Sequence, residues 1–451
     1  MNRIAKTSYI ILGAALMLGS CSQEETPVER PDGNDRRIVF HTSLPEVSTK
    51  AMEITRDLPF FHMTAFDETD SRLIAGDTLK GYFYNKKLII ESGSTNAVSD
   101  ECVWPDPGFE SDIMHFFAYY PELKSGASLV NGTDARSENK EIGYKINGYR
   151  VETDIADQVD FVTAYTKGSM DENYFSGINL NFRHQLSRIE VKTKGSHKSC
   201  DIEIAGVRIA NAPMQGTFEF QKSDADGTWT DLVKGNAEYI FREGDAIVKV
   251  GAEPVSIMGS KIDSDNDNCA LLIPTTCAAW DYTNDAGNNG KGMYLNVLLR
   301  IIDKTPTTGN GKVQYPYFDN SQGLNAMNIP REYFAVITAT GTVSKRLYKN
   351  GNGYCTDAAL TQPYTLASGE EIREFGWAAL PIRADWQPGY SYSYTLDYTS
   401  GVGVHGPDVT GEVSPKAGDP IISDRVGVSV SVNEWQGLNG STTHTVDVPG
   451  A

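Results

Sequence analysis

A strict alternation of apolar and polar residues near the end of the chain constrains the fold most strongly. Aromatic or aliphatic residues occupy every second position from Tyr390 to Tyr398, and valines do the same from Val426 to Val432, just before Trp435. A period of two places these side chains on one face of an extended strand, whereas a helix would scatter them around its axis. We therefore expect strands that bury one face against a core.

The same pattern recurs along most of the chain. Residues 113–120 are apolar on both faces, which is typical of a central strand covered on both sides. Gly206 stands where the apolar positions switch face, as a β-bulge would produce. We expect further strands at 60–66, 81–91, 161–165, 178–182, 189–193, 218–220, 270–273, 294–302 and 334–340. With no long amphipathic helix, the prediction is an all-β fold.

The length of 451 residues is too great for one ordinary core and suits two or three domains. Residues 123–149 are rich in Gly, Asn and charge, and we interpret them as a long surface excursion. A polar link at 166–176 is the expected domain boundary. It divides the chain into an N-terminal β domain (37–175) and a C-terminal β domain (176–435), which a tail (436–451) follows.

The N-terminus indicates a lipoprotein. Basic residues precede an apolar run at 9–18, which is too short to span a bilayer as a helix and leads into Leu-Gly-Ser-Cys, ending at Cys21. This order matches a bacterial lipobox. We interpret residues 1–20 as a signal peptide, Cys21 as the lipidated residue and residues 21–36 as a flexible tether.

Charge and cysteine usage narrow the partners. The chain carries 59 Asp and Glu against 40 Lys and Arg, which argues against nucleic acid as a partner. Besides Cys21 it has an odd number of cysteines and no CxxC motif, so we favour single thiols. A disulfide between Cys269 and Cys277 is left open. The five cysteines are Cys102, Cys200, Cys269, Cys277 and Cys355.

No motif for catalysis is present: HExxH, GxSxG, Walker A and GxGxxG patterns are all missing from the sequence. Asp263, Asp265 and Asp267 resemble the start of a calcium loop, but Asn268 and Pro274 occupy positions where an EF-hand needs Gly and Glu. We expect a solvated loop there. The prediction is a protein that is not an enzyme, with no metal and no cofactor.

The first segment that we expect to fold is 37–56. Ile38, Phe40 and Leu44 share one face of a strand, which Pro45 ends. The basic residues Lys50 and Arg56 follow closely. We expect an edge strand that holds its place in a sheet until a protease cuts behind it.

Together these segments resemble the fimbrillin family, the subunits of type V pili. The matching pieces occur in family order over nearly the whole mature chain: the lipobox, the first strand followed by Thr-Lys-Ala at 49–51, DIMHFFAYYP at 112–121, NFRHQLSRIEV at 181–191, WQPGYSYSYTL at 386–396 and the closing strand before Trp435. The resemblance implies two transthyretin-like β-sandwich domains in tandem, export to the bacterial outer membrane through the lipid on Cys21, and a place in a surface fimbria.

The resemblance also implies a mechanism of assembly. A trypsin-like maturation protease would cut after Lys50, or at Arg56, and remove the first strand. The terminal strand of another pilin subunit, in a homo- or heteropolymer, would then fill the groove. In this chain the donor would be the tail after Trp435, through its alternating residues Thr442, His444, Val446 and Val448. Whether the chain is a shaft, tip or anchor subunit, and what it adheres to, stay open.

A second hypothesis comes from another class of protein. The chain can be interpreted as a non-catalytic, glycan-binding surface lipoprotein that stacks exposed Trp229, Trp280 and Trp386 on sugar rings.

Overall fold

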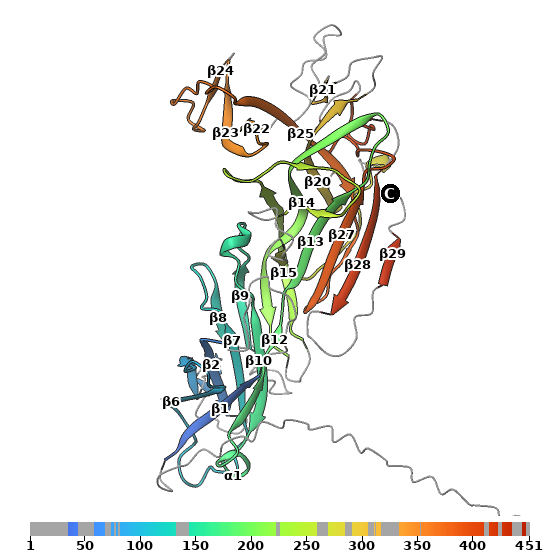
Figure 1. Cartoon of the computed structure of the whole chain (residues 1–451). Helices are drawn as coiled ribbons and strands as arrows, with labels where there is room; N and C mark the ends of the chain where they lie inside the picture. Colours follow the sequence, from blue (N-terminus) through green and yellow to red (C-terminus); the bar gives the residue numbers. More distant parts are fainter. Residues whose placement is uncertain are drawn as a thin grey trace, which may run out of the picture. The chain divides into compact units, whose positions relative to one another are not determined.

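The computed structural model describes residues 35–43, 58–67, 74–75, 78–79, 82–131, 144–221, 226–258, 269–284, 291–304, 311, 313–316, 333–351, 353–409, 415–422, 426–434 and 444–447. Residues 36–451 form one compact unit. Its described part consists mainly of strands (Figure 1). The remaining regular elements are the short helix α1 (Met170–Asn173) and the 3₁₀ turns η2 (Ile155–Asp157) and η3 (Tyr282–Asn284). The all-β prediction is confirmed.

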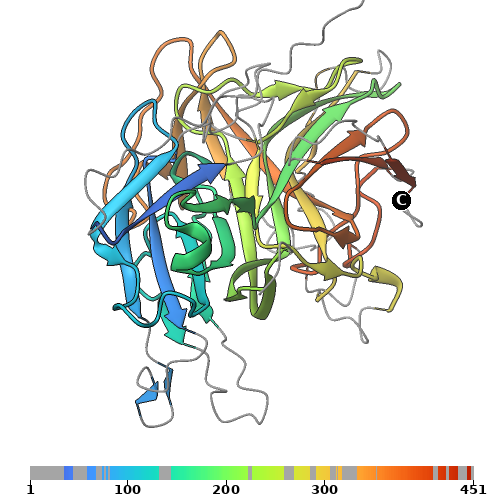
Figure 2. The same ribbon diagram turned by 90° about the horizontal axis from the view of Figure 1, so that it is seen from below.

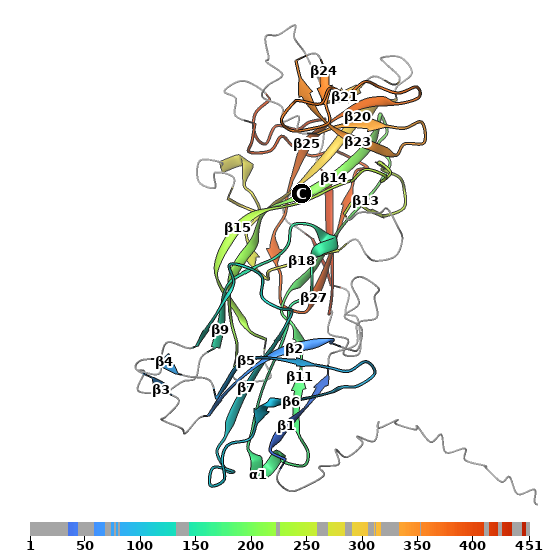
Figure 3. The same ribbon diagram turned by 90° about the vertical axis from the view of Figure 1, so that its left-hand side faces the viewer.

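The first part of the fold is the β1 sheet packed against the β7 sheet (Figure 3). The β1 sheet has the order β11-β1-β6, with β1 (Arg37–Ser43), β6 (Asn96–Val103) and β11 (Ile178–Asn181). The β7 sheet has the order β12-β10-β7-β2-β5, with β12 (Arg183–His184), β10 (Val162–Gly168), β7 (Met114–Tyr120), β2 (Phe60–Asp67) and β5 (Phe83–Ile89). Figure 2 shows α1 against the strands of this part.

The expected central strand at 113–120 is confirmed as β7. It lies between β10 and β2, and its residues from Met114 to Tyr119 are buried on both faces of the sheet. Phe116 contributes to the core shared with the β1 sheet, which we call the first core, whereas Phe117 contributes to a larger second core. The doubly apolar sequence thus follows from two cores meeting at one sheet.

The second core lies between the β14 sheet and the β27 sheet. The β14 sheet has the order β24-β23-β22-β25-β20-β14-β9-β8, with β24 (Gly353–Cys355), β23 (Val343–Asn350), β22 (Tyr333–Ile337), β25 (Glu371–Pro381), β20 (Tyr294–Asp303), β14 (Cys200–Glu219), β9 (Tyr144–Arg150) and β8 (Ser128–Asn131). Also joined to it are β15 (Thr228–Ile240), β16 (Val248–Lys249) and β21 (Val313–Tyr315).

The β27 sheet contains the strands with the clearest alternation. Its order is β17-β13-β27-β28-β29, with β17 (Val255–Ser256), β13 (Ser187–Lys194), β27 (Tyr390–Asp397), β28 (Gly427–Glu434) and β29 (His444–Asp447), and β18 (Ala270–Leu272) also pairs with β13. Two-stranded pairings within the described residues are β3 (Ile74–Ala75) with β4 (Thr78–Leu79), and β19 (Thr276–Cys277) with β26 (Ala384–Asp385).

The predicted bulge at Gly206 is confirmed. The register between β14 and β20 shifts between Ile204 and Gly206. A side chain there would clash, because a Cβ on Gly206 would lie 2.5 Å from the carbonyl oxygen of Tyr239 on β15. The glycine therefore lets three neighbouring backbones approach closely.

The interpretation of residues 123–149 as a surface excursion is wrong for residues 144–149, whereas residues 123–129 are exposed or half-buried. β8 and β9 belong to the β14 sheet, and Tyr144 and Ile146 are fully buried in the second core. Ile146 pairs with Phe218 of β14, which lies about seventy residues further along the chain. Residues 132–143, which carry much of the Gly, Asn and charge behind that interpretation, lie outside the described residues.

The division at residue 176 stays a prediction, but the pairings cross it. β11 joins the β1 sheet and β12 joins the β7 sheet, although both follow residue 176. Ile178, Leu180 and Phe182 lie in the first core.

None of the helices in the described ranges has the length and apolar character needed to cross a membrane.

Candidate functional site

β1 is an interior strand, so the expectation of an edge strand is wrong. β1 is antiparallel to β6 on one side and parallel to β11 on the other. The amide of Thr42 donates to the carbonyl of Thr95 at 2.8 Å, and the amide of Phe182 donates to the carbonyl of Ser43 at 2.8 Å. Both backbone edges of β1 are therefore occupied.

The inner face of β1 holds the predicted residues in the first core. Ile38 and Phe40 have no exposed surface, whereas Leu44 lies outside the described residues. The ring of Phe40 meets the rings of Phe61 and Phe116 edge-on, with centroid distances of 6.2 Å and 5.6 Å. Burying two side chains of this size contributes about 3–6 kcal/mol to stability.

The outer face of β1 is tied to both neighbouring segments by His41. Its Nε2 lies 3.0 Å from the carbonyl oxygen of Ser176, which can only accept, so Nε2 carries a proton and donates. Its Nδ1 lies 2.7 Å from Oδ1 of Asn96 at the start of β6. The ring packs over Gly177, where an added Cβ would lie 2.6 Å from Nε2. One side chain thus bridges the segments on both sides of β1.

The residues that meet His41 were not found from the sequence. The strand β6 reads NAVSDECV, which has little apolar alternation, and the only local signal is the turn-forming Ser-Gly-Ser-Thr at 92–95 before it. Within β6, Ala97 and Cys102 face the first core. The contact between Asn96 and His41 depends on the pairing of β6 with β1, which the sequence of β6 does not indicate.

The strands that pair with β1 are distant from it in the sequence, so the segments just before and just after β1 are the ones that connect it to the chain. On the N-terminal side, Arg36 forms an ion pair with Asp106 at 2.9 Å and donates to the carbonyl of Trp104 at 2.5 Å. On the C-terminal side the chain enters residues 44–57, which contain Lys50 and Arg56 and lie outside the described residues. Cys21 lies outside them as well.

The predicted donor tail is paired with its own chain. β29 runs antiparallel to β28 at the edge of the β27 sheet (Figure 1). In this register His444 is opposite Val432 and Val446 is opposite Val430. Thr442 and Val448 lie outside the described residues.

The tryptophans of the glycan-binding hypothesis are packed rather than exposed. Trp280 and Trp386 are 2% and 1% exposed, and the indole Nε1 of Trp386 donates to the hydroxyl of Tyr394 at 2.9 Å. Trp229 is half-buried and its ring meets those of Phe161 and Phe218 at 5.8 Å and 5.2 Å. A stacking surface for sugar is therefore not formed by these three residues.

The cysteines at 102, 200, 269, 277 and 355 are buried free thiols, so the single-thiol interpretation is confirmed over a bridge between Cys269 and Cys277. Burial raises the pKa of the Cys102 thiol to about 12 and the pKa values of Cys200 and Cys269 to about 11. Asp263, Asp265 and Asp267 lie outside the described residues.

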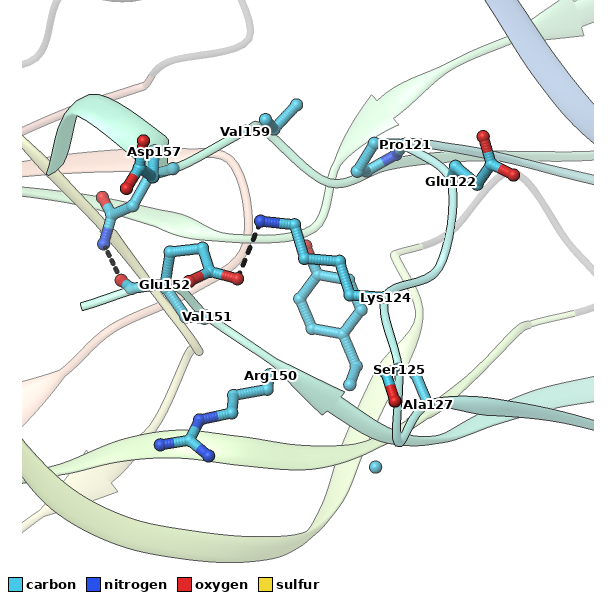
Figure 4. A pocket seen from close by; sticks show the side chains of 13 residues that line it. Pro121, Glu122, Lys124, Ser125, Ala127, Arg150, Val151, Glu152, Asp157 and Val159 are labelled. Atoms are coloured by element: carbon cyan, nitrogen blue, oxygen red, sulfur yellow. Dashed lines mark hydrogen bonds and ion pairs between the residues drawn. The ribbon is translucent and has the colours of Figure 1, made fainter. Parts of the chain in front are cut away.

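Two cavities among the described residues are bordered by paired charges. One of about 90 Å³ lies beside Pro121 and Val151, where Lys124 forms a 2.7 Å ion pair with Glu152 across its mouth (Figure 4). Another of about 410 Å³ is bordered by Arg242, which is ion-paired with Asp154. Across the described residues, no cluster of three metal-binding side chains is found.

Comparison with known proteins places these features in a family. The model of the fimbrillin-like family matches residues 61–415. Among solved structures, a fimbrial assembly protein from Parabacteroides distasonis is 8% identical, with 91% of this chain and 98% of that chain covered and a TM-score of 0.34. A candidate cell adhesion protein from the same species is 12% identical, with 90% and 98% covered and a TM-score of 0.38.

A candidate cell adhesion protein from Bacteroides ovatus is 11% identical, with 81% of this chain and 92% of that chain covered and a TM-score of 0.32. No curated protein matches the chain. The family match alone spans more than half of the sequence, and apart from Phe60 it covers β2 to β27 of the described fold. This chain belongs to the fimbrillin-like family.

Proposed function

We propose that this protein is a structural or accessory subunit of a bacterial surface pilus that serves adhesion. It is exported as a lipoprotein and polymerises by protease-triggered donor-strand exchange. The observation that carries the proposal is the position of β1. It fills the centre of the β1 sheet, yet a single segment, residues 44–57, joins it covalently to the rest of the fold.

Proteolysis is the first step. A trypsin-like protease that cuts after Lys50 or Arg56 breaks the link between β1 and β2, which begins at Phe60. β1 then stays on the same fragment as Cys21 and is held in the fold by non-covalent contacts alone. If Cys21 carries the lipid, a single cut frees the body of the subunit from its outer-membrane anchor and makes β1 replaceable.

The groove is the second step. When β1 leaves, β6 and β11 each lose a backbone pairing partner, and the places of Ile38 and Phe40 in the first core become open to water. Unpaired backbone groups and exposed apolar pockets are costly in water. A strand from another subunit restores both sets of contacts, which is recognition by β-strand addition.

The donor is the third step. For the tail to reach another subunit it must first leave β28, where β29 is paired over four residues at a sheet edge. Each backbone hydrogen bond contributes roughly 0.5–1.5 kcal/mol net. An interior groove of this kind on another subunit offers pairing on both sides, so a tail whose side chains fit it gains backbone pairing when it leaves a sheet edge.

The test uses limited digestion by a trypsin-like protease and then electron microscopy of producing cells. The wild type should release an N-terminal fragment ending at Lys50 or Arg56, and cells should carry filaments that an antibody to this chain labels. The double variant Lys50→Ala and Arg56→Ala should lack both, whereas the control Lys198→Ala, an exposed lysine on another segment, should behave as the wild type. Labelled filaments on cells that produce only the double variant would refute the proposal.

A further inference from the structure

We propose that the groove under β1 is built for a strand with a large apolar residue at the Phe40 position, and that this strand comes from a different subunit rather than from a second copy of this chain. The inference rests on the proposed function and names the partner that the groove would accept. It is drawn from the walls of the Phe40 pocket and from the composition of the chain's own tail.

The Phe40 pocket has rigid aromatic walls. Phe40 is fully buried against Phe61 and Phe116. Those rings are supported from behind, because Phe61 meets Phe182 at 5.7 Å and Phe116 meets Trp104 at 6.1 Å. Close-packed walls of this kind relax only partly when a smaller side chain replaces the original one, so a cavity remains.

The chain's own tail does not supply a matching side chain. Its alternating positions offer Thr442, His444, Val446 and Val448 on one face, and Thr443, Thr445 and Asp447 on the other. Valine leaves much of a phenylalanine pocket empty, and histidine brings two polar nitrogens into it. The larger Leu438 lies one residue after Gly437 and two before Gly440, in a stretch poorly suited to a strand.

The outer face of the groove makes the mismatch worse. At the position after Phe40, the groove presents the carbonyl oxygen of Ser176, which accepts from Nε2 of His41 and favours a donor over a carboxylate. With Val446 in the pocket, Asp447 would direct a carboxylate at that oxygen. With Val448 in the pocket, the next residue is Pro449. With His444 there, Thr445 supplies a donor but a polar ring enters the core. No register of the alternating residues 442–448 meets both requirements.

The chemistry of the matching partner follows from β1 itself. The partner strand carries a branched aliphatic residue, then a residue that fits the buried Val39 position, then a large aromatic or aliphatic residue, then a hydrogen-bond donor, in the order of Ile38, Val39, Phe40 and His41. It runs parallel to β11 and antiparallel to β6, as β1 does. Filaments that contain this chain are therefore mixed polymers at its groove.

Binding of fluorescent peptides to the protease-trimmed protein tests this. A peptide of residues 36–49 should bind and serves as the reference. The tail peptide of residues 436–451 should bind at least about 10-fold more weakly than the same peptide with Val446→Phe. Adding Asp447→His should strengthen binding again. The matched control Thr445→Phe places the ring on the opposite face and should give no gain.

Equal binding of the wild-type and Val446→Phe tails, with the reference peptide bound, would overturn this inference and leave strand exchange intact. If the reference peptide also fails to bind and the β1 fragment stays in place after the cut, the proposed function itself fails. Binding of the reference peptide, together with release of the β1 fragment, distinguishes these two results.

Discussion

At the scale of single residues, the fold changes the pKa values of the buried free cysteines. Cys102 has no exposed surface, and burial raises its pKa to about 12, while the pKa values of Cys200 and Cys269 rise to about 11. The thiolate is the reactive form. At pH 8, about one in a thousand or fewer of these thiols is ionised.

We therefore expect Cys102, Cys200 and Cys269 of the folded protein to react with a colourimetric thiol reagent at pH 8 at least about 100-fold more slowly than free cysteine, and to react readily once the chain is unfolded in guanidinium. Cys21 is replaced by Ser in the sample so that only the buried thiols are counted. Rapid reaction of Cys102, Cys200 or Cys269 in the folded state would contradict the burial.

Buried histidines give the stability a pH dependence of definite sign. Burial on β2 lowers the pKa of His62 below its ordinary 6.5, and nearby Lys87 lowers it further, although Glu122 acts in the opposite direction. Burial also lowers the pKa of His405. At acidic pH the unfolded chain therefore binds more protons at these histidines than the folded protein does. Their contribution to the free energy of unfolding is full above about pH 6.5 and is lost as the pH falls through the lowered pKa values.

The variant His62→Gln separates this effect from the titration of carboxylates. Its free energy of unfolding, measured in urea, should fall less between pH 7 and pH 5 than that of the wild type. Ser196→Ala, an exposed residue between β13 and β14, is the control and should follow the wild type. A wild-type decrease no larger than that of His62→Gln would show that His62 titrates normally.

At the scale of single elements, β29 is an edge strand with little support. It has one pairing partner, β28, over four residues. Removing residues 436–451 should therefore lower the free energy of unfolding by only roughly 1–3 kcal/mol, with the fold retained. Urea unfolding followed by circular dichroism measures this, and a loss of cooperative unfolding would mean that the tail is part of the core rather than a detachable strand.

The elements also show what the sequence could predict. β7, β27 and β28 were predicted because their apolar patterns are long and unbroken. β6, β8 and β9 were missed because they are polar or short, and their burial depends on partners elsewhere in the chain. Ile38 and Phe40 were assigned to the core by alternation alone, but the interior position of β1 was not predictable. His41 meets residues that are 55 and 135 positions away.

At the scale of the whole molecule, the sheets are assembled from segments that are far apart in the chain. β1 pairs with β11, and β9 pairs with β14. Aromatic residues of β7 and β9 share one core with a residue that directly follows β14. The ring centroid of Phe117 lies 5.2 Å from that of Tyr144 and 5.7 Å from that of Phe220. A simple division into consecutive domains therefore cuts through pairings.

This arrangement predicts that a fragment of residues 37–175 does not fold by itself. It lacks β11, the parallel partner of β1, and it leaves β9 without β14. A fragment of residues 36–434 keeps all of these pairings and is the control. In urea, the longer fragment should unfold cooperatively and the shorter one should not; cooperative unfolding of the shorter fragment would establish an independent N-terminal domain.

The central claim is that β1 is a replaceable strand, and a removable disulfide tests it most directly. His41 and Asn96 are opposite each other in β1 and β6, so His41→Cys with Asn96→Cys can staple β1 in place. After cutting at Lys50 or Arg56, the oxidised protein should keep β1 and fail to capture a labelled peptide of residues 36–49. Reduction should release β1 and restore capture. Equal capture by the oxidised and reduced forms would contradict the claim.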